Sequence, residues 1–293
     1  MFQNLTYAGN PVLFSKLVQD GHCVSDAHAT LSVACHAILW RKASEQIEKN
    51  KKKRSKSPQK SDFFSQTAVD GVIVVHYRRA ACRKRTFKRL LQERGLPTSS
   101  PRLHWAEHFD GDTALTLGIV NKCVACSLLI RPKRFSPVEL TQASCTLNHL
   151  YAYHLAMLLG WNRAMILEDD AGLPSNFALL LQNGMRVMPK NWSIYNFGCP
   201  YPTRHAKLHG GSLACSRGYV LTRAAFSSFL QNAQTVGGGA DWMVHRLSAK
   251  TEVKHEVRTW HSGIPVIERS VQNNTRLSRT RADDCIFKTW PQE

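Results

Sequence analysis

Hydrophobic and polar positions follow two different periods along the chain, and these periods predict alternating strands and helices. Residues 71–77 form an uncharged, β-branched run that predicts a buried strand. Apolar residues at helical spacing then predict a helix that ends before Gly95 and a longer helix from Pro137 to about Leu159. The apolar run at 164–167 predicts a second buried strand.

The second half of the chain continues this alternation. It predicts strands at 193–197 and 213–221 and helices at 174–185 and 223–231. Strands that alternate with helices are typical of an α/β fold, because each helix connects two strands that run in the same direction. We therefore expect an α/β domain with a mainly parallel central sheet.

Three carboxylates, Glu168, Asp169 and Asp170, follow the strand at 164–167 directly. Open α/β sheets bind ligands outside the carboxyl ends of their strands, so these acids lie where a site is expected. Adjacent carboxylates repel one another, and a divalent cation with oxygen ligands, Mn²⁺ or Mg²⁺, would relieve that repulsion. Side chains two positions apart in an extended segment share a face, which makes Glu168 and Asp170 the candidate metal ligands. The alternative is a solvated acidic turn that ends the strand.

Basic residues cluster where the first strand meets the helix that follows it. Arg78, Arg79 and Arg83 lie near the start of that helix. A helix N-terminus and guanidinium groups both favour phosphate, so this segment resembles the first half of a nucleotide-binding βα unit. The alternative is an ordinary amphipathic helix whose outer face is basic.

Two further segments contain candidate chemistry. Cys145 and His149 are one helical turn apart, a spacing that suits a metal ion but more often reflects packing around a hydrogen-bonded histidine. Asp241 follows three glycines at 237–239. An acid after such a loop is a candidate catalytic carboxylate, and the alternative is a helix N-cap.

Composition adds a strongly basic surface to this picture. The chain has 293 residues, a formal net charge of +18 and 43% hydrophobic residues, which is enough for a sizeable core. Basic residues at 51–60 are interleaved with serine, proline and glutamine, which predicts a partly disordered linker with weak, nonspecific affinity for nucleic acid. We therefore divide the chain into an N-terminal extension, residues 1–67, and a catalytic domain, residues 68–293.

The sequence contains few signals for the cellular compartment. No apolar run reaches the roughly 20 residues that a membrane-spanning helix needs, so no transmembrane segment is expected. The nine cysteines are odd in number and irregular in spacing, which favours a reducing cytoplasm over an oxidising lumen. A location in the endoplasmic reticulum or Golgi would require a targeting segment in addition.

The order of these landmarks resembles glycosyltransferase family 25, the lipooligosaccharide and procollagen galactosyltransferase group, over roughly residues 72–278. A first strand leads into an arginine-rich helix. The blocks that follow in family order are Phe109-Asp110-Gly111, Cys145-Thr146-Leu147-Asn148-His149, Ile166-Leu167-Glu168-Asp169-Asp170, residues 212–225, Asp241 and residues 265–278. The chain departs from the family in having His76-Tyr77 where Asn-Leu is usual, and Asn148 where serine is usual.

The resemblance implies a GT-A-like fold that binds a nucleotide-sugar. It also implies metal-dependent, inverting transfer of a hexose, galactose or glucose, from a UDP-sugar to a glycan or protein hydroxyl. In that enzyme Glu168 and Asp170 hold Mn²⁺ against the diphosphate, and Asp241 is the candidate base for the acceptor hydroxyl. The residues expected to bind the nucleotide-sugar are Arg78, Arg79, Arg83, Asp110, His149 and Asp169.

Other classes of function remain open from the sequence alone. A basic nucleic-acid-binding protein would explain the charge of +18 but not three acids at a strand end, which repel phosphate unless a metal is bound. A metal-dependent nuclease or phosphoesterase would explain both features. An inactive glycosyltransferase-like binding module would explain the departures from the family pattern.

Overall fold

A computed structural model of the protein describes residues 33–53, 62–78, 80–109, 137–188, 190, 192–197, 216–232, 240, 243–244, 259–261 and 268–269. Its labelled helices are α2 (Val33–Lys53), α3 (Asp62–Thr67), α4 (Ala81–Glu93), α6 (Pro137–Leu158), α7 (Phe177–Arg186) and α8 (Arg223–Asn232). Its strands are β1 (Gly71–Val75), β2 (Leu103–Ala106), β3 (Arg163–Glu168), β4 (Ala171–Gly172), β5 (Ile194–Asn196), β6 (Gly218–Thr222), β7 (Thr259–His261) and β8 (Glu268–Arg269).

Six strands form the central sheet in the order β2-β1-β3-β6-β5-β7. The pairings of β1 with β2, β1 with β3, and β5 with β7 are parallel, and only β6 runs against its two neighbours among these strands. The predicted α/β fold with a mainly parallel sheet is therefore confirmed. Strands β4 and β8 form a separate two-stranded sheet, in which Gly172 pairs with Glu268.

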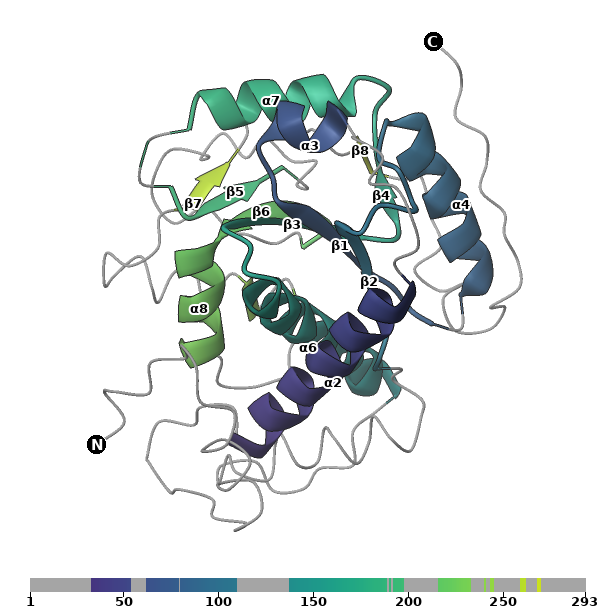
Figure 1. Ribbon diagram of the computed structural model, residues 1–293, viewed down its shortest axis with the longest axis vertical. Coiled ribbons are helices and arrows are strands. Elements are labelled where there is room, and N and C mark those ends of the chain that lie inside the picture. Colours follow the sequence, from purple (N-terminus) through teal and green to yellow (C-terminus); the bar gives the residue numbers. More distant parts are fainter. Residues whose placement is uncertain are drawn as a thin grey trace.

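Side chains of the sheet alternate between two apolar layers, as the period of two in a strand requires. On one face Val72 and Val74 of β1 and Leu167 of β3 pack with helices α3, α4 and α7. On the other face Ile73 and Ile166 pack with α2, α6 and α8. Figure 1 shows these two helical layers with the sheet between them. Burial on both faces explains why the parallel strands are continuous apolar runs.

Two helices end where the sequence predicts, and glycine is the reason in both cases. Helix α4 ends at Glu93, and Gly95 beyond it has a φ of +79°. Helix α6 ends at Leu158, and Gly160 beyond it has a φ of +72°. A left-handed backbone conformation strongly favours glycine, which has no Cβ to clash with the preceding turn.

Helix α6 is covered by the sheet on one side and by α2 on another. Leu39 and Ala43 of α2 are fully buried in the same apolar cluster as the core positions of α6. Phe63 of α3 is buried in the cluster on the opposite face of the sheet. Helices α2 and α3 therefore pack against the elements of residues 68–293, one on each face of the sheet.

Within the ranges that the structure describes, no helix is both long and apolar enough to cross a membrane. Cys35 and Cys82 each take part in a disulfide bond. Disulfides persist mainly in oxidising compartments.

A pair of buried histidines lies between α2 and α6. His36 Nδ1 is 3.1 Å from His154 Nε2, and the Trp40 ring packs against His154 in a T-shaped arrangement. Burial lowers the pKa of His36 to about 4. Burial and the nearby His36 also lower the pKa of His154 well below its ordinary value. Both imidazoles are therefore neutral in the folded protein near neutral pH.

We predict that the free energy of unfolding falls as the pH is lowered from about 6.5 toward 4. In this range the two imidazoles bind protons in the unfolded chain but stay neutral in the folded protein. The free energy of unfolding can therefore fall by up to about 1.4 kcal/mol per pH unit for each imidazole. Urea denaturation at several pH values measures the slope. The variant His36→Leu removes one of the two imidazoles and should reduce the slope, whereas an unchanged slope would assign the pH dependence to other groups.

Candidate functional site

Polar side chains gather at the carboxyl ends of three neighbouring parallel strands. His76 follows β1, Glu107 follows β2 and Glu168 ends β3. The backbone ties the first two ends together, since His76 N donates to Ala106 O at 3.0 Å. In an α/β protein this edge of the sheet is where ligands bind.

The three adjacent acids point in different directions. Glu168 is two positions after Ile166 and reaches α6, whereas Asp169 is two positions after Leu167 and reaches α4. Asp170 lies in the turn that follows β3. Because β3 ends at Glu168, strand alternation does not determine where the Asp170 side chain points. Strand alternation therefore does not place Glu168 and Asp170 on one face, although the two acids are close enough to interact electrostatically.

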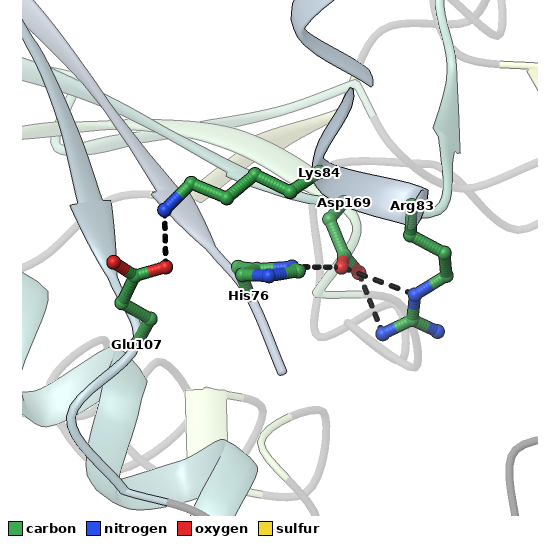
Figure 2. Close-up of polar contacts among 5 residues, drawn as sticks. All are labelled: His76, Arg83, Lys84, Glu107 and Asp169. Atoms are coloured by element: carbon green, nitrogen blue, oxygen red, sulfur yellow. Dashed lines mark hydrogen bonds and ion pairs between the residues drawn. The ribbon is translucent and has the colours of Figure 1, made fainter. Parts of the chain in front are cut away.

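The buried Asp169 carboxylate forms an ion pair with the partly exposed Arg83 on the α4 side of the sheet, as Figure 2 shows. Asp169 is 4% exposed, and its Oδ2 accepts a hydrogen bond from Arg83 Nε at 3.1 Å. Arg83 Nη2 lies 3.0 Å from the other carboxylate oxygen, and His76 Nδ1 lies 2.5 Å from Oδ2. A buried carboxylate requires such partners, because an unpaired charge is costly to bury. Arg83 and Asp169 thus hold each other in place.

Further contacts lie on the same α4 side of the site and involve Lys84, Glu107 and Trp105. Lys84 Nζ pairs with Glu107, as Figure 2 shows, and lies 4.8 Å from the centre of the Trp105 ring. His76 meets the Trp105 ring in a T-shaped arrangement, with the ring centres 5.6 Å apart. These contacts join α4 to the ends of β1 and β2, so the basic helix is held firmly against the strand ends.

Glu168 turns to the opposite face of the sheet. His149 Nε2 on α6 lies 3.2 Å from Glu168 Oε1, and the Ser216 hydroxyl donates to the same oxygen. Burial alone would raise the pKa of Glu168. The hydrogen bond and electrostatic attraction between His149 and Glu168, the hydrogen bond from Ser216 and the charge of Arg217 outweigh burial and hold that pKa below its ordinary value. Glu168 is therefore an ionised carboxylate in a fixed orientation.

Asp170 is the acid in this block with an unpaired oxygen. Its Oδ1 is buried and accepts no hydrogen bond from the described residues. Burial, followed by the negative charges of Glu168 and Asp169, raises the pKa of Asp170 to about 7. A buried, unpaired carboxylate oxygen beside a second carboxylate suits a divalent cation that prefers oxygen ligands. The residues present therefore fit the metal ion that the sequence implies.

Asn148 of α6 holds the segment that follows β2. Its Oδ1 accepts from the backbone N–H groups of His108 at 3.2 Å and Phe109 at 3.4 Å, and its Nδ2 donates to Phe109 O at 3.0 Å. The Ser144 hydroxyl donates to the same carbonyl. Helix α6 thus fixes the chain immediately before Asp110, which gives Asn148 a structural role.

The structure places only part of the predicted site. Arg79, Asp110 and Asp241 lie outside the described residues. Arg78 is exposed shortly after β1. The predicted residues that come together around the end of β3 are Arg83, His149, Glu168, Asp169 and Asp170. Their assignment to nucleotide or metal stays a prediction, and so does the catalytic role of Asp241.

Three residues that hydrogen-bond to the predicted site residues were not themselves predicted from the sequence. His76 had a usable signal, because a polar residue directly after a buried parallel strand lies at the ligand-binding edge. Ser216 contacts Glu168, and Tyr219 Oη lies 2.6 Å from His149 Nδ1. Neither residue could be assigned to the site from its local sequence, because β6 lies beside β3 only after the sheet has formed.

No protein-family model and no curated protein matches this chain. Among solved structures, the chain is similar to the mannosyltransferase PcManGT from Pyrobaculum calidifontis, which was solved in complex with GDP-Man and Mn²⁺. The similarity has a TM-score of 0.39 at 13% sequence identity, and it covers 84% of this chain and 70% of that chain. A likeness this distant does not establish a function.

We predict that Arg83→Met lowers the free energy of unfolding by roughly 1.5–3 kcal/mol, because Asp169 stays buried and loses a charged partner. The matched control is Arg85→Met, which removes the same charge from an exposed position on the same helix. The control should change stability by less than about 0.5 kcal/mol. Urea denaturation measures both variants, and equal effects would contradict a stabilising ion pair.

Proposed function

We propose that the chain is a metal-dependent, inverting glycosyltransferase with a GT-A-like fold, related to glycosyltransferase family 25. It transfers a hexose, galactose or glucose, from a UDP-sugar to a hydroxyl group of a glycan or glycoprotein. The main support is the buried, unpaired Oδ1 of Asp170 close to ionised Glu168, at the carboxyl ends of parallel strands. The order of the sequence blocks around these acids is an independent support.

Because one of the three consecutive acids is held in an ion pair, two carboxylates are left to bind a cation. Arg83 and His76 engage Asp169, so the negative charge left for a ligand comes from Glu168 and Asp170. One or two carboxylates together with substrate phosphates are the usual ligands of a catalytic Mg²⁺ and of chemically similar hard cations. His149 and Ser216 keep Glu168 ionised and oriented for this task.

The start of α4 supplies positive charge for the two phosphates of the donor. Arg78 is exposed shortly after β1, and Arg79 is its neighbour in sequence. Both could contact the diphosphate, and Arg83 supports the site through its ion pair with Asp169. A bound Mn²⁺ or Mg²⁺ would stabilise the negative charge that develops on the leaving diphosphate.

Inverting transfer also requires a group that accepts the proton of the acceptor hydroxyl. Carboxylates that bind a cation are poor bases, so this group is a separate acid, and Asp241 is our first candidate. Glu268 is the second candidate, because β8 pairs with β4 and places Glu268 opposite Gly172, two residues after Asp170.

We predict that Asp170→Asn weakens manganese-dependent binding of a UDP-hexose by more than about tenfold, because loss of even an outer-shell partner costs about 10–100-fold in metal affinity. The substitution also removes a buried, unpaired charge, so the melting temperature should stay the same or rise. Titration calorimetry with UDP-glucose or UDP-galactose, with Mn²⁺ or with a chelator, measures the binding.

The control for this experiment is Glu93→Gln, which makes the same change of charge at a half-exposed side chain on α4. It should bind the donor as the unmodified protein does. Unchanged metal-dependent affinity in folded Asp170→Asn would contradict the metal assignment. Equal donor binding with and without Mn²⁺ in the unmodified protein would contradict metal dependence altogether.

We predict that Asp241→Asn keeps its affinity for the UDP-hexose and lowers the transfer rate by about 10²–10⁴-fold, the usual contribution of a general base. Asparagine has nearly the same size and still caps a helix, so donor binding serves as the internal control. Transfer to a panel of hydroxyl acceptors measures the rate. A near-normal rate would return Asp241 to the role of a helix cap and make Glu268→Gln the next variant to test.

A further inference from the structure

A thiol, an imidazole and a carboxylate meet between α6 and the end of β3. Cys145 and His149 are one turn apart on the same side of α6, and Glu168 faces His149 from β3. One ligand atom from each of the three residues lies within 4.8 Å of the other two. Cys145 is not part of a disulfide, in contrast to Cys35 and Cys82.

The separation of the imidazole and the carboxylate already suits a metal ion. His149 Nε2 lies 3.2 Å from Glu168 Oε1. Two ligands that bind a tetrahedral zinc ion at about 2.0–2.1 Å lie roughly 3.3 Å apart. An ion could therefore replace the hydrogen bond between these two residues without a large movement of either. Cys145 and Glu168 are half-buried, so solvent can supply a fourth ligand.

Two tyrosine hydroxyl groups lie on the Nδ1 side of the His149 imidazole and orient the ring. His149 Nδ1 lies 2.6 Å from Tyr219 Oη, which lies 2.8 Å from Tyr153 Oη. Each hydroxyl can donate and accept, so these hydrogen bonds can run in either direction. If Nδ1–H donates to Tyr219, Nε2 presents a lone pair to a metal. If Tyr219 donates instead, Nε2–H donates to Glu168, and the imidazole is satisfied without an ion.

The ligand set selects the kind of metal. A thiolate and an imidazole favour zinc, whereas Mn²⁺ and Mg²⁺ prefer sites made of oxygen atoms. Ligating histidines usually donate their other ring nitrogen to a fixed partner, and Tyr219 provides one here.

We propose that Cys145, His149 and Glu168 form a zinc-binding site, which shares Glu168 with the donor-metal site at Asp170. Zinc in this site engages Glu168 and so competes with the donor metal for it. The competition rests on the proposed function, whereas the binding of zinc does not depend on it. On this proposal zinc acts as an inhibitor of transfer.

Cobalt(II) is the probe for this site, because it occupies zinc sites and reports thiolate ligation by a charge-transfer absorption band. The full chain, without nucleotide-sugar, should develop this band on addition of Co²⁺ and lose it on addition of Zn²⁺ but not of Mn²⁺. Cys145→Ser and Cys145→Ala should each lose the band attributable to this site and bind zinc at least about tenfold more weakly.

The two tyrosines provide a matched pair of variants. Tyr219→Phe removes the partner of His149 and should weaken zinc binding by about 10–100-fold. Tyr153→Phe removes a hydroxyl that does not contact His149 and should leave zinc affinity within about threefold of the unmodified protein. Thermal unfolding without metal checks that each variant is folded. Equal zinc affinity and an unchanged cobalt spectrum in both folded Cys145 variants would overturn the proposal.

The cobalt spectrum and the transfer assay separate this proposal from the proposed function. A thiolate band that depends on Cys145 supports the zinc site even if no hexose is transferred. If transfer is observed, zinc should inhibit it in competition with Mn²⁺, and Cys145→Ser should raise the inhibitory zinc concentration by at least about tenfold. Transfer that zinc inhibits equally in both proteins would contradict the competition at Glu168.

Discussion

The pairing of Asp169 with Arg83 and His76 is the interaction on which the candidate site depends. Three consecutive carboxylates at the end of a buried strand repel one another, and burial strengthens that repulsion. Strand geometry sends the first acid toward α6 and the second toward α4, where each meets its own partners. Because Arg83 pairs with Asp169, the negative charge left for a ligand belongs to Glu168 and Asp170. Of these two acids, Asp170 has a buried oxygen that accepts no hydrogen bond from the described residues.

Helix α6 connects this chemistry to the rest of the fold. One side of the helix orients Glu168 through His149 and holds the chain after β2 through Asn148. Another side packs against α2, where the buried pair of His36 and His154 lies. The position of the site therefore depends on a helix from the N-terminal part of the chain, and any loss of α2 should be felt at the carboxyl ends of the strands.

Local signals in the sequence were sufficient for the order and type of the main elements, because apolar runs, Pro137 and the glycines at 95 and 160 act within a few residues. The packing of α2 was missed although a signal existed, since α6 is apolar on nearly all sides and must be covered on more than one. The ion pair between Arg83 and Asp169 joins residues 86 positions apart, and no local pattern specifies such a contact. The three acids could be located from sequence, but their separate roles required the neighbours that only the folded sheet supplies.

The central claim is that a divalent cation binds Asp170 while Asp169 remains with Arg83 and His76. Anomalous diffraction from crystals of the protein grown with Mn²⁺ and a UDP-hexose tests it most directly. The account predicts a manganese peak within coordination distance of a carboxylate oxygen of Asp170, with the Asp169 ion pair intact. A peak on Asp169 with Arg83 displaced, or a bound donor with no manganese near Asp170, would contradict it.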